Sequence, residues 1–83
     1  MSAEQTVSAE PRPEVLVRLM EMADRYRAAS EIRQAIEIYF ELVEDHEDSP
    51  QAKQARRCLM EIAVAYERVG GRRQARGIYE RLL

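Results

Sequence analysis

From Pro13 onward the apolar residues of this chain recur every three to four positions, which is the spacing of one face of an α-helix. A proline suits the first turn of a helix because its missing N–H would be unsatisfied there anyway. The first helix is therefore predicted from Pro13 to near Ala28. Its inward stripe is formed by Leu16, Leu19, Met22, Ala23 and Tyr26.

Three further helices follow from the same pattern. Ser30 can cap a second helix, predicted over Ile32 to Val43, by accepting a bond from an early backbone N–H. Ser49-Pro50 repeats the start signal for a third and longest helix, which ends at the Gly70-Gly71 break. The fourth helix continues to the end of the chain on the stripe Ala75, Ile78, Tyr79 and Leu82. No strand-like alternation is found, so the expected fold is all-α.

The segment from Leu19 to Val43 reappears forty positions later as Leu59 to Leu83, in register and without a gap. A period of this length is typical of stacked supersecondary units rather than of an enzyme core. We therefore expect one domain over residues 13–83, built from two tandem helix-turn-helix repeats, 14–45 and 50–83. Their four antiparallel helices should stack as a short α-solenoid, whereas residues 1–12 lack apolar periodicity and are expected to form a disordered tail.

Each copy places a large residue, a small residue, a tyrosine, a turn, an alanine, an aromatic residue and a leucine at a common spacing. These residues are Leu19, Ala23, Tyr26, Ala35, Tyr39 and Leu42 in the first copy, and Leu59, Ala63, Tyr66, Gly70, Ala75, Tyr79 and Leu82 in the second. Over Glu14 to Leu83 this pattern resembles the tetratricopeptide repeat family. The small residues let the two helices of a hairpin cross closely. The chain departs from the family in its longer period, against about 34 residues, and in having Ala29-Ser30 in place of the turn glycine.

Positions that differ between the copies indicate where each helix lies in the stack. The second helix has an additional apolar face, Ile32, Ile36 and Phe40, whereas its counterparts in the fourth helix are Arg72, Arg76 and Glu80. At the other end, Cys58 and Ala65 of the third helix correspond to Arg18 and Arg25 of the first. We expect the second helix to be sandwiched and both ends of the stack to be capped by polar residues, as solubility requires.

The resemblance implies that the first helices of the two repeats line a concave groove that receives peptides or partner helices. The residues of this groove would be Val17, Met20, Asp24, Arg27, Arg57, Met60, Val64 and Glu67. Its four apolar members would form a floor edged by both charges, and methionine adapts well to irregular partners. The alternative is that these four residues fill ordinary core. The basic clamp that captures carboxylates in chaperone-binding members is not matched as a set, because Asp24 and Glu61 are unsuited to it.

The chain has 83 residues and a net charge of −2, which conceals an uneven distribution. Residues 1–49 carry five basic and twelve acidic groups, and residues 50–83 carry eight basic and three acidic groups. This asymmetry can steer a charged partner, although charge on helical proteins usually marks a solvated face. A single cysteine cannot form an internal disulfide, and no export signal or membrane-spanning apolar run is found, so a cytoplasmic location is expected.

Nothing in the chain predicts catalysis. Phosphate-binding glycine loops, nucleophile elbows and paired cysteines are all missing from the sequence, and no cofactor or small-molecule substrate is expected. His46 lies in an acidic stretch that could gather around a cation, but a lone histidine in a flexible loop is more often solvated. Cys58 on a packed helix indicates a small buried residue. An arginine cluster (Arg68, Arg72, Arg73, Arg76 and Arg81) could meet phosphates, but it lacks interleaved exposed aromatics, which disfavours nucleic-acid binding.

The leading functional hypothesis is a non-enzymatic adaptor or scaffold that binds a protein segment in the groove, with affinity from apolar contact and orientation from the flanking charges. The alternative is an oligomerisation or accessory subunit. In that case the same groove is buried in a homodimer or in a permanent assembly. A two-repeat domain lies below the usual minimum of about three repeats. A homodimer or a permanent partner would supply the missing stability.

Overall fold

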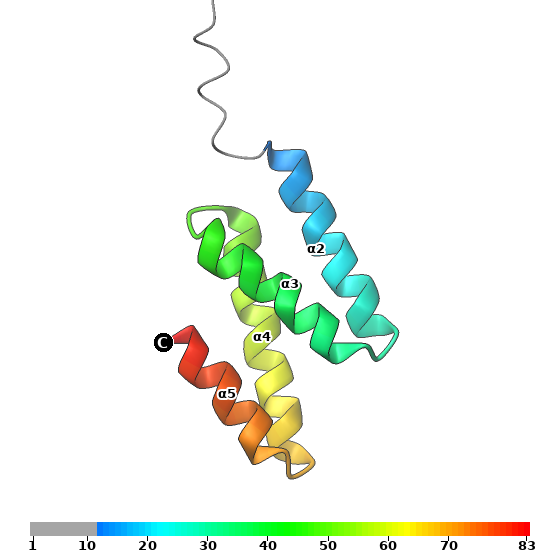
Figure 1. Cartoon of the computed structure of the whole chain (residues 1–83), viewed down its shortest axis with the longest axis vertical. Helices are drawn as coiled ribbons and strands as arrows, with labels where there is room; N and C mark the ends of the chain where they lie inside the picture. The colour runs from blue at the N-terminus through cyan, green and yellow to red at the C-terminus, as the bar shows by residue number, and fades with distance from the viewer. Residues whose placement is uncertain (1–11) are drawn as a thin grey trace, which may run out of the picture.

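The computed structural model describes residues 12–83, and this part of the chain forms four helices and no strands (Figure 1). The helices are α2 (Pro13–Ala28), α3 (Ile32–Asp45), α4 (Pro50–Arg68) and α5 (Arg72–Leu82). The predicted all-α fold is confirmed, with α3 extending two residues beyond its predicted end. The predicted tail lies outside the described residues except for Arg12, whose extended backbone leads into α2.

The start of α4 follows the predicted capping chemistry. Ser49 Oγ accepts a hydrogen bond of 3.0 Å from the backbone N–H of Ala52, and Pro50 occupies the first turn. Ser49 Oγ also donates to the backbone carbonyl of His46 at 2.7 Å. One side chain therefore satisfies an orphan N–H at the helix start and fixes the chain that enters it.

The prediction that Ser30 caps α3 is wrong. Ser30 has a φ of 65°, its side chain makes no cap bond, and Glu31 precedes α3. Ser30 instead terminates α2: its N–H donates to the Arg27 carbonyl, and that of Glu31 donates to the Tyr26 carbonyl. The Gly70-Gly71 turn repeats the same pattern, with Gly70 at a φ of 86°. The serine thus replaces glycine in a left-handed helix-terminating position.

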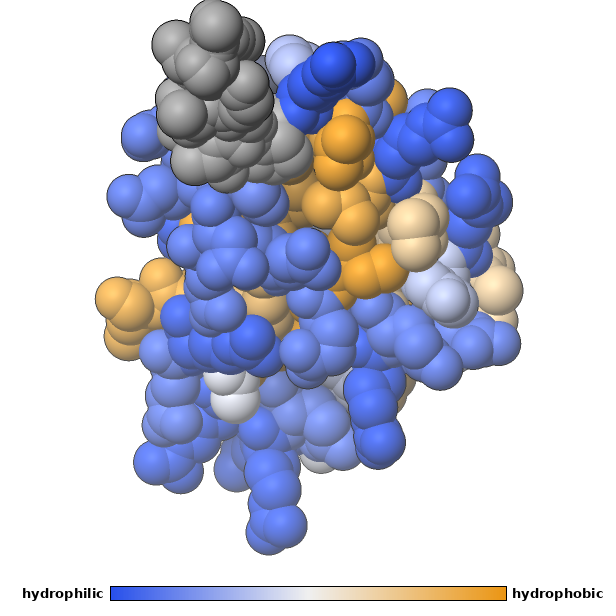
Figure 2. All heavy atoms as spheres, turned by 45° about the horizontal axis from the view of Figure 1, so that its top comes forward, coloured by the Kyte–Doolittle hydropathy of each residue, from blue (hydrophilic) through white to orange (hydrophobic). Residues whose placement is uncertain are grey.

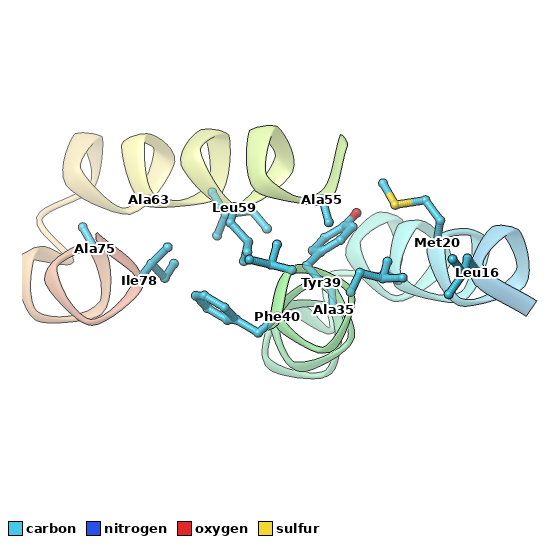
Figure 3. Packing of buried hydrophobic residues seen from close by; sticks show 14 residues of the cluster. Leu16, Met20, Ala35, Tyr39, Phe40, Ala55, Leu59, Ala63, Ala75 and Ile78 are labelled. Atoms are coloured by element: carbon cyan, nitrogen blue, oxygen red, sulfur yellow. The ribbon is translucent and has the colours of Figure 1, made fainter. Parts of the chain in front are cut away.

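The helices form two hairpins that stack side by side. Each helix packs on the next one along the chain, and α2 also contacts α4. As a result α3 packs against both α2 and α4 (Figure 1), and α5 packs against α4 on the side that also faces α3 (Figure 3). This arrangement agrees with two stacked helix hairpins and places the first helix of each repeat on a shared side.

One core runs through all four helices (Figure 3). Its largest fully buried side chains are Tyr39, Phe40, Leu42 and Leu59, and Phe40 points from α3 toward Ile78 of α5. The four small residues expected at the helix crossings are all buried: Ala23, Ala35, Ala63 and Ala75. The absence of larger side chains there lets the paired helices approach.

The two ends of the stack differ from the expectation in part. On α5, Arg72, Arg76 and Glu80 are exposed as predicted, while Phe40 is buried and Ile32 and Ile36 are half-buried. At the α2 end, Met22 was expected to point inward but is exposed, because no helix among residues 12–83 packs on that side of α2. Ala65, expected to pack against the preceding helix, is also exposed, whereas Cys58 is half-buried.

Arg81 fastens α5 to α3. Its guanidinium lies 4.1 Å from the centre of the Phe40 ring and forms two hydrogen bonds with Glu44, from Nε at 2.8 Å and from Nη2 at 3.1 Å. Nη1 also lies 3.6 Å from Glu37. The hydrogen bonds from Arg81 lower the pKa of the Glu44 carboxyl below its ordinary value. A planar, forked donor suits this combination of ring stacking and bidentate pairing.

Candidate protein-binding site

The eight residues predicted for the groove lie on α2 and α4, which run in the same direction (Figure 1). They do not form one continuous floor. An ion pair between Arg27 Nη1 and Glu61 Oε1, 3.2 Å apart, links the two helices. Glu61 precedes Glu67, the repeat counterpart of Arg27, by six residues or about 9 Å of helix, so α4 is shifted along α2. Val17, near the start of α2, is exposed and does not line the hollow beside Met60.

Met20 does not belong to an exposed groove. Only 5% of its surface is accessible, whereas its repeat counterpart Met60 is 43% accessible. The difference has a positional cause: α4 packs against α2 and covers Met20, but among residues 12–83 no helix packs over Met60 in the same way. Figure 3 shows the Met20 side chain turned from α2 toward the side on which α4 lies.

Asp24 takes part in a contact within the fold. The buried hydroxyl of Tyr39 donates a hydrogen bond of 2.6 Å to Asp24 Oδ1. Burial raises the pKa of this hydroxyl well above its ordinary value of 10.0, and the bond to Asp24 raises it further. Cys58 of α4 lies beside the same hydroxyl, and burial raises the pKa of its thiol. Asp24 and Arg27 therefore connect helices within the fold.

The remaining apolar pair forms an open surface on α4, which we call the α4 face: Met60, Glu61, Val64 and Arg68. These four residues line a hollow of about 300 Å³. Val64 is 36% accessible, and the two charged residues border the apolar pair with opposite signs. Of the remaining predicted groove residues on α4, Arg57 is exposed. Glu67 accepts a hydrogen bond of 3.1 Å from the Tyr79 hydroxyl of α5. The α4 face is what remains of the predicted groove.

A second group of exposed apolar residues was not predicted as a site. Val15, Met22 and Tyr26 are all partly accessible on another side of α2, and Met22 and Tyr26 line a hollow at its C-terminal end. The repeat contained a signal for them, because their counterparts Ala55, Ile62 and Tyr66 require a helix in front of them. The predicted inward orientation of Met22 and Tyr26 is wrong, since both side chains are exposed.

The charged residues outside the predicted groove are distributed over the surface. Residues 12–83 contain no group of three His, Cys, Asp or Glu side chains placed to hold a metal ion, and His46 is half-buried. Two members of the arginine cluster face acidic partners, Arg76 with Glu80 at 2.9 Å and Arg81 with Glu44. Figure 2 shows hydrophilic side chains over most of one face, with apolar side chains surfacing in limited patches. None of the helices in this range is both long and apolar enough to cross a lipid bilayer.

Comparisons with protein-family models, with curated proteins and with solved structures gave no match to this chain.

Proposed function

We propose that this chain is a non-enzymatic protein-interaction module that holds a segment of a partner protein against the α4 face. The observation that carries the proposal is the exposure of Met60 and Val64 above a hollow at a position where the first repeat buries Met20 beneath a helix. The fold thus contains one covered and one uncovered copy of the same surface. An uncovered apolar surface with a charged border is typical of protein-binding sites.

The chemistry of the α4 face favours a segment with an apolar anchor and charges of both signs. Methionine has a flexible, polarizable side chain that adapts to different anchors. Glu61 on one side and Arg68 on the other can orient such a segment through complementary charges. Because Glu61 also pairs with Arg27, a bound segment that recruits Glu61 would compete with a contact between α2 and α4.

We further propose that the chain is a two-repeat relative of the tetratricopeptide proteins and acts in the cytoplasm. The two turns with equal hydrogen-bond patterns and the buried alanine pairs support the repeat assignment. The cytoplasmic assignment rests on the single cysteine, for which no disulfide partner is present in the sequence.

The test compares two substitutions that introduce the same charge. Met60→Glu places a carboxylate on the α4 face, and Val69→Glu places one at a highly exposed apolar position outside it. Immobilised wild-type protein should retain a stoichiometric partner from native lysate, Val69→Glu should retain it equally, and Met60→Glu should lose it because burying the charge costs several kcal/mol, about 2 or more. Both variants should melt near the wild type. Equal retention by all three proteins would refute the assignment to the α4 face.

A second candidate function is an oligomerisation subunit that buries the α4 face against another copy of the chain. The two-repeat size favours it, because a stack this short gains stability from a further layer. Solution mass over a concentration series separates the candidates. A monomer at all concentrations supports the adaptor, and a dimer that Met60→Glu dissociates supports the subunit.

A further inference from the structure

The outer face of α2, defined by Val15, Arg18, Met22, Arg25 and Tyr26, has no helix packed on it among residues 12–83. In Figure 1 α2 forms one edge of the molecule. Val15 is 44% and Met22 38% accessible, and Tyr26 is also exposed. These residues recur at helical spacing and therefore share one side of the helix. This surface is separate from the α4 face, which lies at the other end of the stack.

The repeat shows what such a face packs against. Its counterpart on α4 comprises Ala55, Cys58, Ile62, Ala65 and Tyr66, of which Ala55 and Ile62 are almost fully buried and Ala65, at the edge of the face, is exposed. The element that covers them is α3. Cys58 lies beside the Tyr39 hydroxyl of α3, and Tyr66 lines the same hollow as Ile36 and Phe40 of α3. The occupant of this kind of surface is thus an amphipathic helix with large apolar side chains.

The shape and charge of the outer face indicate which kind of helix it can bind. A hollow of about 310 Å³ lies at the C-terminal end of the outer face, lined by Met22, Arg25, Tyr26, Ala29 and Glu31. It has room for a large apolar side chain. Arg18 and Arg25 replace Cys58 and Ala65 of the second repeat, and neither makes an ion pair with any residue from 12 to 83. Two exposed guanidinium groups beside an apolar stripe favour acidic residues on the covering helix.

A second copy of this chain fits the outer face poorly. A two-fold contact between two α2 helices would bring Arg18 and Arg25 of both copies into one interface. Head-to-tail stacking would place the same arginines over α5, whose corresponding surface presents Arg72, Arg76 and Glu80, and Glu80 is already paired with Arg76. Like charges disfavour both arrangements.

We propose that the outer face of α2 docks an acidic amphipathic helix of a partner protein, with the apolar stripe of that helix on Val15, Met22 and Tyr26. The acidic residues of the docked helix lie opposite Arg18 and Arg25. The contact reproduces, in trans, the packing of α3 on α4. It gives the module a second interaction surface, independent of the α4 face.

The probe for this proposal is a peptide with the sequence of residues 31–45, which is itself acidic and amphipathic. A covalent staple replacing Gln34 and Glu41, both exposed in α3, keeps it helical, and a fluorescent label reports binding to the intact protein by anisotropy. Saturable binding is expected. Met22→Glu should weaken it about tenfold or more, whereas the matched control Val69→Glu should change it less than about twofold.

Two further variants separate the possible outcomes. Exchanging Arg18 and Arg25 for glutamate should abolish binding, because the new carboxylates repel the acidic residues of the probe. The protein should remain folded, because both side chains are exposed. Met60→Glu, on the α4 face, should bind the probe normally, which makes failure of this proposal distinct from failure of the proposed function. The proposal is overturned if the probe does not bind, or if it binds Met22→Glu and the wild type equally. It is also overturned if a dimer forms that Met22→Glu dissociates, because the outer face then belongs to a second copy.

Discussion

At the scale of single residues, Ser30 and Gly70 occupy the same left-handed position in two equivalent turns, at φ values of 65° and 86°. An L-residue in this conformation is strained by about 1 to 2 kcal/mol. Replacing it with glycine relieves this strain, but part of the gain is offset because glycine loses more backbone freedom on folding. Ser30→Gly should therefore stabilise the fold by about 0.5 to 1 kcal/mol. Urea unfolding measures the change. Ala29→Gly is the control, since Ala29 has a φ of −87° and glycine there should be destabilising. A destabilised Ser30→Gly would contradict the helix-terminating role.

The Tyr39 hydroxyl leads to a prediction about alkaline pH. Burial raises the pKa of Tyr39 above 10.0 and the pKa of Cys58 above 9.0 in the folded protein. Both groups therefore keep their protons to higher pH when folded than when unfolded. Their contribution to stability is complete below the unfolded values, and it decreases as the pH rises above about 9 to 10, because unfolding then releases protons.

The comparison that tests this prediction uses Tyr39→Phe. At neutral pH the substitution should cost about 1 kcal/mol, because it removes the hydrogen bond to Asp24, whose exposed carboxylate can rehydrate. The slope of unfolding free energy against pH above about 9 should be smaller in Tyr39→Phe than in the wild type. Parallel slopes would show that Tyr39 has no part in the alkaline loss of stability.

At the scale of helices, α3 and α5 share a repeat position but differ in what surrounds them. Phe40 is buried between helices, whereas its counterpart Glu80 is exposed and pairs with Arg76 one turn away. Phe40→Ala should destabilise the fold by about 3 to 5 kcal/mol through cavity formation and loss of the ring beneath Arg81. Glu80→Ala should stay within about 0.5 kcal/mol. Small, equal effects in thermal unfolding would be incompatible with a sandwiched α3.

At the scale of the whole molecule, the two hairpins share a core and should not fold independently. Much of that core lies at the junction of α3 and α4, where Tyr39, Phe40 and Leu59 are fully buried. A fragment of residues 12–46 would expose the α4-facing side of α3, and helices of about 12 to 15 residues are marginal alone. Circular dichroism should show much lower helicity per residue in the fragment than in residues 12–83. A cooperative thermal transition in the fragment would show that each hairpin is autonomous.

The helix bounds and the repeat were readable from the sequence because they depend on local chemistry. Proline at the starts of α2 and α4, the Ser49 cap and the regular apolar spacing each act within a few residues. The exposed residues of α5 were also predictable, since arginine and glutamate replace isoleucine and phenylalanine at equivalent positions. The candidate site was predicted less well. Met60 and Val64 are exposed as expected, but Met20 is buried, and the outer face of α2 was missed.

The sequence by itself therefore determined four helices, their approximate ends and their pairing into two similar hairpins. The tertiary structure decided which copy of each repeated surface is covered. Met20 and Met60 are the same residue in the same register, yet only Met20 is buried, because α4 covers it and no helix among residues 12–83 covers Met60 in the same way. Met22 is exposed and its counterpart Ile62 is buried for the converse reason, since α3 packs on α4, whereas no helix among residues 12–83 packs on the corresponding side of α2. Helical periodicity is a local property, whereas burial depends on neighbouring helices, and these differ at the two ends of the stack.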